Sequence, residues 1–183
     1  MTTAQDPTWL LFVDIDGTVR HGKDELGRFV NRAEDVRVFP AAARNIQAWR
    51  AAGGHVVGVT NQGGVALGHL TMGDMHAALI ETALQCGGMF ENILVCTHAP
   101  APNGEPACWC RKPSPGMAYN HFNSLTGDQY SPQRTLVVGD RDEDSGFAAA
   151  IGAQFLRADL WRAGRYPDPF RHLAPGMASE PTP

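Results

Sequence analysis

The chain lacks the long apolar run that a membrane-spanning helix requires. Although 43% of its 183 residues are hydrophobic, no run approaches the roughly 18 apolar residues of such a helix. The amino-terminal sequence MTTAQDPTWLLFVDID has no basic segment ahead of its apolar stretch, so we expect no signal peptide and a cytoplasmic protein. An excess of positive charge is also missing. The formal net charge of −4 disfavours broad binding to nucleic acids and to anionic membranes.

Internal repeats and sustained heptad patterns are absent as well, and the length suits one domain with a sizeable core. We therefore expect a monomer with a single domain over residues 1–166. Residues 167–183 are rich in proline and small side chains, which predicts a flexible tail. The polar and charged stretch 20–38 is too long for a simple turn and predicts an irregular loop beside the functional site.

Cysteine is scarce, yet three of the four cysteines lie within the fifteen residues CTHAPAPNGEPACWC, numbered 96–110. In a reducing cytoplasm such a cluster indicates a metal site more often than disulfides. Together with His98, the thiols of Cys96, Cys108 and Cys110 form a complete set of four zinc ligands. Because a catalytic zinc keeps an open position, four protein ligands predict a structural Zn²⁺ that ties this loop together.

The remaining cysteine and three other histidines stand apart from this cluster. Cys86 lies in a segment with a helical pattern and is expected to be a small buried apolar residue. His69, His76 and His121 could compete as ligands of a catalytic zinc. Lone histidines without paired spacing are, however, more typical of surface or helix positions.

Short apolar runs alternate with helical patterns along the chain. The expected strands are residues 9–13, 55–60, 92–96, 135–139 and 154–156, and the expected helices are 41–52, 71–85, 115–125 and 144–151. Continuous apolar runs of this length are typical of strands covered on both faces. Thr71 is expected to cap the second of these helices, with Asp74 three residues on. The alternation predicts an α/β fold with a doubly wound, Rossmann-like parallel sheet, whose sites lie at the carboxyl ends of the strands.

Carboxylates follow two of these strands. The first strand runs into Asp14 and Asp16, within DIDGT, and the strand 135–139 is followed by Asp140. Asp and Gly are common in solvated turns, so either motif alone is weak evidence. In a parallel sheet, however, the two strands could bring these carboxylates to one rim. Clustered oxygens with open positions suit Mg²⁺, which also offsets the repulsion between the acids.

Groups suited to bind a phosphoryl group follow the strand 55–60. Its end, TNQGG, supplies the hydroxyl of Thr60, the amides of Asn61 and Gln62, and flexible glycines. Arg111 and Lys112 come directly after the cysteine cluster and could bind an anion. Each motif alone is typical of an ordinary turn or a solvated surface. Together, in this order and each near a strand end, they indicate a phosphoryl-transfer site.

With these motifs the chain resembles the haloacid-dehalogenase-like (HAD) phosphohydrolases. DIDGT resembles their first motif, the strand-end Thr60 their second, Lys112 their third and GDRDED their fourth. VTNQGGVALGHLT, CTH…CWCRKPSPGM and VVGDRDED are similar to the zinc-containing branch with the heptose-bisphosphate and histidinol-phosphate phosphatases. The resemblance covers about residues 10–156. It implies the family fold with a minimal cap and a zinc-bound loop.

The resemblance also implies a role for each matching residue. Asp14 would be the nucleophile that forms an aspartyl-phosphate, and Asp16 the general acid and base. Mg²⁺ would be held by the side chains of Asp14 and Asp140 and by the backbone carbonyl of Asp16. The residues expected to stabilise the phosphoryl group are Thr60 and Lys112, and those expected to bind or orient the substrate are Asn61, Gln62, Arg111 and Arg141, the last standing where the heptose enzymes commonly have Lys.

Some positions depart from the heptose-bisphosphatase pattern. Ile15 replaces an Arg often found there, Gly63 replaces a Ser, and CTHAP replaces CPHHP. The resemblance implies a phosphatase for a small sugar phosphate such as D-glycero-D-manno-heptose 1,7-bisphosphate. Histidinol phosphate, another small metabolite phosphate and a polynucleotide 3′-phosphate remain open as substrates. A non-catalytic, zinc-stabilised binding module is disfavoured because all four family motifs are intact.

Overall fold

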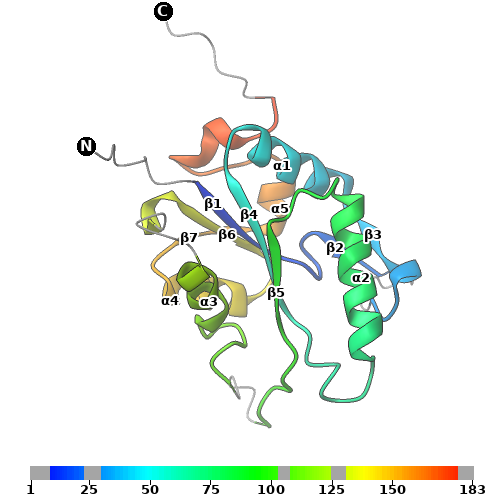
Figure 1. Ribbon diagram of the computed structural model, residues 1–183. Coiled ribbons are helices and arrows are strands. Elements are labelled where there is room, and N and C mark those ends of the chain that lie inside the picture. The colour runs from blue at the N-terminus through cyan, green and yellow to red at the C-terminus, as the bar shows by residue number, and fades with distance from the viewer. Residues whose placement is uncertain (1–8, 23–29, 103–107, 125–130, 177–183) are drawn as a thin grey trace, which may run out of the picture.

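A five-stranded parallel sheet lies at the centre of the protein (Figure 1). The computed structural model describes residues 9–22, 30–102, 108–124 and 131–176. The strands are β1 (Leu10–Asp14), β4 (His55–Asn61), β5 (Asn92–Cys96), β6 (Thr135–Gly139) and β7 (Gln154–Arg157), in the order β5-β4-β1-β6-β7. Each pairs with its neighbours in parallel. The predicted α/β class is therefore confirmed.

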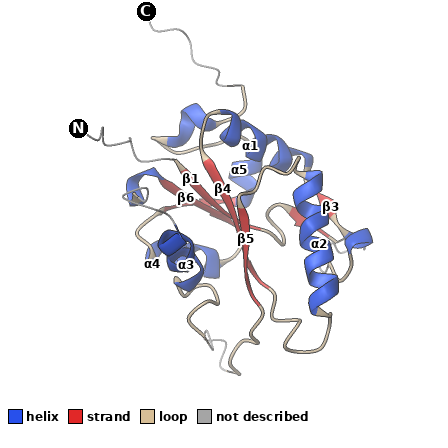
Figure 2. Ribbon diagram, in the orientation of Figure 1, coloured by secondary structure: helices blue, strands red, loops and turns tan. Residues whose placement is uncertain are grey.

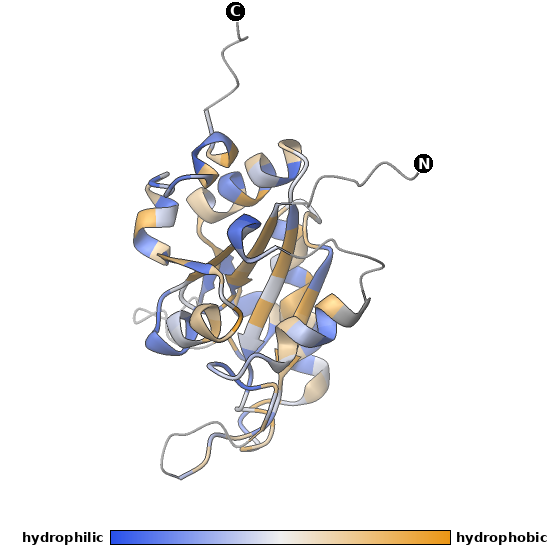
Figure 3. Ribbon diagram, turned by 90° about the vertical axis from the view of Figure 1, so that its left-hand side faces the viewer, coloured by the Kyte–Doolittle hydropathy of each residue, from blue (hydrophilic) through white to orange (hydrophobic). Residues whose placement is uncertain are grey.

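Helices cover both faces of this sheet (Figure 2). On β1, Leu11 and Val13 pack into one core, and Leu10 and Phe12 into the other, because successive side chains of a strand point to opposite faces. The first core is completed by α1 (Pro40–Ala51), α2 (Met72–Gln85) and α5 (Ala158–Arg162), the second by α3 (Gly116–Ser124) and α4 (Asp142–Ala150). With both faces covered, the strands are hydrophobic along most of their length (Figure 3).

Local sequence explains where the two long helices begin. In α1, Pro40 occupies the first turn, where its missing N–H costs nothing. In α2, the Thr71 hydroxyl accepts a hydrogen bond from the Asp74 amide at 3.0 Å. This is the predicted cap. The short helix α5, which directly follows β7, was not predicted.

The stretch 20–38 contains more structure than the expected irregular loop. Its described part forms β2 (Arg20–His21), the 3-10 helix η1 (Ala33–Asp35) and β3 (Arg37–Val38), with β2 and β3 antiparallel. Residues 23–29 lie outside the described part. A second 3-10 helix, η2 (Pro132–Arg134), leads into β6.

The segment after residue 166 also differs from the expected flexible tail. It forms the 3-10 helix η3 (Phe170–Leu173), in which both Phe170 and Leu173 are buried. The Phe170 ring stacks on Trp49 with centroids 5.9 Å apart and meets the edge of Trp9 at 5.4 Å. Apolar anchoring therefore holds this segment against the core, whereas residues 177–183 of the expected tail lie outside the described part.

The strand order places a reversal at β1. The chain moves outward from β1 to β4 and β5, then returns to the other side of β1 as β6 and β7. In open parallel sheets, ligands bind outside the carboxyl ends of the strands at such a reversal. Among the described residues, no helix is long and apolar enough to cross a membrane.

Candidate active site

The loop after β1 turns sharply at the reversal of strand order. Gly17 has φ +89, a conformation that residues with a Cβ rarely adopt. A Cβ there would also collide with the carboxylate of Asp140. The Thr18 hydroxyl donates to Asp14 Oδ2 at 2.9 Å, and Arg162 donates to the carbonyls of Gly17 and Thr18 at 2.9 Å. The glycine thus lets the loop bring Asp14 and Asp140 together.

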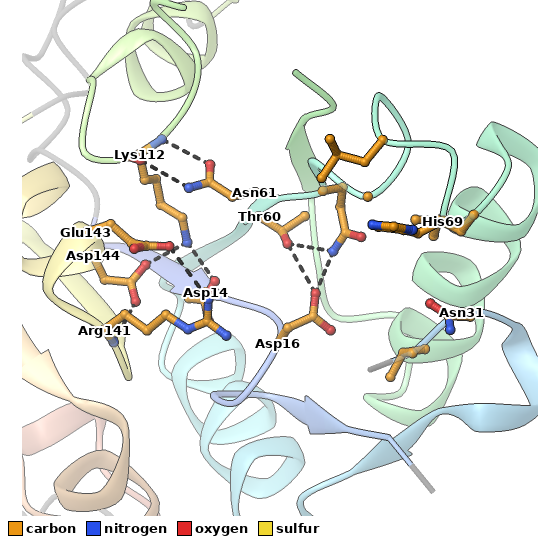
Figure 4. Close-up of a pocket in the computed structure, with 15 residues that line it drawn as sticks. Asp14, Asp16, Asn31, Thr60, Asn61, His69, Lys112, Arg141, Glu143 and Asp144 are labelled. Carbon is orange, nitrogen blue, oxygen red and sulfur yellow. Dashed lines mark hydrogen bonds and ion pairs between the residues drawn. The ribbon is translucent and has the colours of Figure 1, made fainter. Parts of the chain in front are cut away.

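Asp14, Lys112 and Asp144 form a buried charged cluster, labelled in Figure 4. Lys112 Nζ lies 2.6 Å from Asp14 Oδ1 and 2.6 Å from Asp144 Oδ1, and it donates to the Val59 carbonyl at 3.1 Å. An ammonium group has three N–H donors, so all three are engaged. Lys112 therefore offsets the charge of Asp14 and fixes the orientation of its carboxylate.

Burial and the neighbouring charges together shift the pKa values of Asp14 and Lys112. Burial raises the pKa of Asp14 from 3.8 to about 7, although Lys112 opposes the rise. Burial alone would lower the pKa of Lys112, but Asp14 and Asp144 outweigh that effect and raise it. The lysine is thus cationic, and when both carboxylates are ionised the cluster without a metal ion carries one negative charge in excess.

Asp144 was not among the predicted site residues. It occupies the first turn of α4, is 1% exposed, and accepts a hydrogen bond from the Arg141 amide at 3.1 Å. Gly139, at the end of β6, allows its approach because a Cβ there would collide with the Asp144 side chain. In the sequence it stands in the run of acidic residues 142–144, with no local feature that separates it from its neighbours.

Carboxylate oxygens of Asp14, Asp140 and Asp144 all lie within 4.8 Å of one another. Oxygen donors of this charge are the ligands that Mg²⁺ prefers. A cation at this point would also offset the excess negative charge of the cluster. The donor set therefore fits Mg²⁺, with Asp144 as an addition to the predicted residues.

Asp16 lies on the other side of the cavity from Lys112 (Figure 4). Its Oδ1 accepts from Arg20 Nε at 2.8 Å. Its Oδ2 accepts from Gln62 Nε2 and lies 3.5 Å from the Thr60 hydroxyl. Gln62 also donates to the Thr60 hydroxyl at 2.9 Å, so its amide group orients two site residues in addition to lining the cavity.

The remaining predicted residues differ in how directly they face the cavity. Asn61 accepts from the Lys112 amide at 3.0 Å and donates to the Lys112 carbonyl at 3.1 Å, which fixes the lysine backbone. Arg141 lines the cavity at its exposed rim. Arg111 donates to the His98 carbonyl at 3.2 Å and packs beside Gly63, so it connects the cysteine cluster to the loop after β4.

Most of these residues, though not Arg111 or Asp140, line a cavity of about 260 Å³ at the carboxyl ends of the strands. One side carries the charged cluster, with Arg141 and Glu143 at the rim. The opposite side is formed by the loop after β4 and the segment before η1. The residues on that side include Val30, Asn31, Gly64, Leu67, His69 and Leu70.

Cys96, His98, Cys108 and Cys110 converge as the sequence predicted. Their ligand atoms lie within 4.8 Å of one another, with sulfur–sulfur distances of 3.4–3.5 Å and His98 Nδ1 3.2 Å from Cys110 Sγ. Zn–S bonds of about 2.3 Å in a regular tetrahedron imply sulfur–sulfur distances of about 3.8 Å. No disulfide joins these cysteines. The geometry and donor types fit Zn²⁺ with no open ligand position. His76 and His121 belong to neither described metal-ligand cluster.

Comparisons with known proteins agree with this geometry. The model of the HAD-hydrolase-like family matches residues 109–157. The D-glycero-beta-D-manno-heptose-1,7-bisphosphate 7-phosphatase of Pseudomonas putida is 32% identical over 151 residues, 79% of either chain. The D-glycero-alpha-D-manno-heptose-1,7-bisphosphate 7-phosphatase of Mycobacterium tuberculosis is 31% identical over 79% of this chain and 76% of its own. The D,D-heptose 1,7-bisphosphate phosphatase from B. bronchiseptica, crystallised with magnesium and phosphate, superposes with a TM-score of 0.66 at 27% identity, covering 80% of this chain and 78% of its own.

Proposed function

The chain belongs to the haloacid-dehalogenase-like phosphohydrolases and is a phosphatase, and we propose that its substrate is a sugar phosphate of the D-glycero-D-manno-heptose 1,7-bisphosphate kind. The observation that carries the proposal is the buried Asp14 carboxylate at the end of β1, held by Lys112 beside Asp140 and Asp144. Members of this family depend on Mg²⁺ and form an aspartyl-phosphate. The similarity to the heptose-bisphosphate phosphatases supports the substrate class.

Asp14 is the proposed nucleophile, and Asp16 the general acid and base. In the first step an Asp14 oxygen bonds to phosphorus as the bond from phosphorus to the sugar oxygen breaks. Asp16 gives that oxygen its proton. In the second step Asp16 takes a proton from water, whose oxygen attacks the phosphorus. Inorganic phosphate leaves and the Asp14 carboxylate is restored.

Charge neutralisation and positioning supply most of the remaining catalysis in phosphoryl transfer. Mg²⁺ bound by Asp14, Asp140 and Asp144, with the Asp16 backbone carbonyl, would offset the charge of the phosphoryl oxygens and of Asp14. Lys112 shares that task from the buried side. The Thr60 hydroxyl contacts the transferring group, and Asn61 and Gln62 hold Lys112 and Asp16 in place. We assign the rim residue Arg141 to the rest of the substrate, and Arg111, held at the His98 carbonyl beside the loop after β4, to the same task.

The Cys96–Cys110 cluster is proposed to hold a structural Zn²⁺. Three thiolates 3.4–3.5 Å apart would repel one another without a cation. Cys110 immediately precedes Arg111 and Lys112, so the metal would fix the position at which the chain reaches the charged cluster. Elemental analysis of the purified protein is expected to give about one zinc per chain, and a value near zero would contradict the assignment.

A screen of phosphate esters tests the substrate. It compares the alpha and beta anomers of heptose 1,7-bisphosphate, histidinol phosphate and a 3′-phosphorylated oligonucleotide, each with and without Mg²⁺. We expect the highest kcat/KM for one of the heptose anomers and no phosphate release by Asp14→Asn. A preference for histidinol phosphate or the oligonucleotide would reject the substrate. Phosphate release by Asp14→Asn would reject the nucleophile.

We also propose that the protein acts in the cytoplasm as a monomer. The support is the metal-ligand cluster of three cysteines and a histidine, a use of cysteine that suits a reducing compartment, and the absence of heptad patterns in the sequence. Light scattering coupled to size-exclusion chromatography should give the mass of one chain. A mass of two chains across a range of concentrations would contradict the proposed state.

A further inference from the structure

Arg20 is a buried charged residue that the proposed catalytic roles leave without a function. It is 1% exposed and is among the largest fully buried side chains of the described residues. Moving a guanidinium group out of water costs several kcal/mol unless hydrogen bonds and an opposite charge compensate. Its partners therefore indicate why it is there.

The partners of Arg20 lie on two separate parts of the fold. Its Nε donates to Asp16 Oδ1 at 2.8 Å. Its Nη1 donates to the Ala78 carbonyl and to the Thr82 hydroxyl oxygen, both at 2.9 Å and both on α2. The Thr82 hydroxyl gives its own proton to the Ala78 carbonyl at 2.7 Å, so its oxygen is free to accept. Arg20 thus connects the loop after β1 to the interior of a long helix.

This connection divides the two oxygens of Asp16 between different neighbours. Arg20 engages Oδ1. The other oxygen, Oδ2, is on the side of Gln62 and Thr60, which line the cavity. We propose that Arg20 is a positioning residue that fixes the Asp16 carboxyl so that Oδ2 faces the leaving-group oxygen of the substrate. The inference rests on the proposed function, in which Asp16 exchanges the proton.

A stabilising role alone does not account for this arrangement. A buried ion pair is often matched or exceeded in stability by apolar side chains of similar volume. Asp16 is itself 32% exposed. The buried Arg20 therefore binds an acid whose carboxyl group remains open to the cavity. That combination suits an acid that must meet a ligand in one orientation.

The backbone of residue 20 is secured independently of its side chain. The Arg20 amide donates to the Ile15 carbonyl at 3.0 Å, and the Gly17 amide donates to the Arg20 carbonyl at 2.9 Å. Arg20 also pairs with Val38 in the small sheet of β2 and β3. Replacement of the side chain therefore leaves the hydrogen bonds that close the loop, and the role of the guanidinium can be tested separately.

The test compares two phosphate esters that differ in their need for a proton. The oxygen of glycerol 1-phosphate must be protonated as it leaves, whereas the oxygen of p-nitrophenyl phosphate leaves as a stable anion. The ratio of their kcat/KM values reports on the first step and does not depend on the fraction of folded enzyme. General acid catalysis contributes about 10²- to 10⁴-fold. In Arg20→Met we expect kcat/KM to fall about 10²-fold or more for glycerol 1-phosphate but less than about tenfold for the aryl ester.

Three further variants separate positioning from a general structural defect. Arg20→Lys should recover part of the ratio, because an ammonium can reach Asp16 but cannot contact α2 at the same time. Thr82→Val removes one anchor of Arg20 and should shift the ratio in the same direction by less. Arg37→Met is the matched control, since Arg37 is an exposed arginine of the same small sheet, and its ratio should equal that of the wild type.

An unchanged ratio in Arg20→Met would overturn the proposal, even if both rates fell together, because an equal loss indicates a structural defect alone. If that variant does not fold, an unchanged ratio in both Arg20→Lys and Thr82→Val overturns it instead. Failure of the proposed function has a different signature. In that case the wild-type protein would release no phosphate from either ester or from heptose 1,7-bisphosphate in the presence of Mg²⁺.

Discussion

Replacement of the nucleophile should stabilise the protein while it removes the activity. Asp14 and Asp144 both contact the single ammonium of Lys112 within 2.6 Å. Without a metal ion, this places two buried carboxylates against one cation. Asp14→Asn removes one negative charge and keeps an oxygen that can accept from Lys112. We therefore expect the variant to be inactive and, without Mg²⁺, more resistant to unfolding than the wild type.

The size of the gain follows from the pKa of Asp14, which burial raises from 3.8 to about 7. The folded protein therefore holds this proton more tightly than the unfolded chain, so wild-type stability falls as the pH rises from about 4 to about 7. Each pKa unit corresponds to about 1.4 kcal/mol. The variant avoids a cost on the order of 4 kcal/mol at pH 8, but only about 1–2 kcal/mol at pH 5.

Thermal unfolding at pH 5 and pH 8, without added Mg²⁺ and without a chelator so that zinc is retained, measures this difference. At pH 8 the midpoint of Asp14→Asn should lie on the order of 10 °C above that of the wild type. The gap should narrow at pH 5. Added Mg²⁺ should also narrow it, because the ion stabilises the protein that binds it.

The control for this experiment is Asp168→Asn, which removes a carboxylate that is 77% exposed and paired with Arg171. Its stability should stay within about 1 kcal/mol of the wild type. The reasoning is refuted if Asp14→Asn is less stable than the wild type at pH 8, or if its advantage is the same at both pH values.

Four other changes have expected outcomes. Cys110→Ser should lose zinc and lower kcat/KM by about 10- to 100-fold, whereas Cys86→Ala, outside the cluster, should keep both zinc and activity. Equal losses in the two variants would contradict the structural role of the zinc. Thiol titration should detect the three cluster thiols only after zinc is removed and Cys86 only in denaturant, because burial raises its pKa to about 12. Asp144→Asn should weaken activation by Mg²⁺ about 10- to 100-fold, and an unchanged Mg²⁺ dependence would remove it from the metal site. Phe170→Ala should cost about 3–5 kcal/mol in urea unfolding, and a loss below about 1 kcal/mol would show that η3 is not anchored.

The sheet could be predicted because its strands are apolar on both faces. That pattern is local, and it gave the five strands with ends at most one residue from those observed. Parallel pairing then sets the position of the motifs. Asp14 pairs with Val59, so Thr60, one residue further on β4, lies beside the loop after β1. The fold class alone therefore predicts that the polar motifs at the strand ends lie close together.

Asp144 was missed because its neighbours in the sequence have the same character. It is the third of three consecutive acidic residues, 142–144, which read as a solvated helix start. Only the phase of α4 separates them, since Asp142 is exposed and Asp144 is buried. That phase depends on the close approach of α4 to Gly139, a contact between two elements that a local pattern does not contain.

Arg20 illustrates the same limit more strongly. The polar composition of the stretch 20–38 predicts a loop, and composition alone places a lone arginine in solvent. Its burial depends on Ala78 and Thr82, which are 58 and 62 residues away in the sequence, and on the carboxyl group of Asp16. A charged residue can be buried only where hydrogen-bond partners and an opposite charge compensate for its loss of water. A buried arginine beside a catalytic loop is therefore evidence about the whole fold, and its function can be read only once α2 is in place.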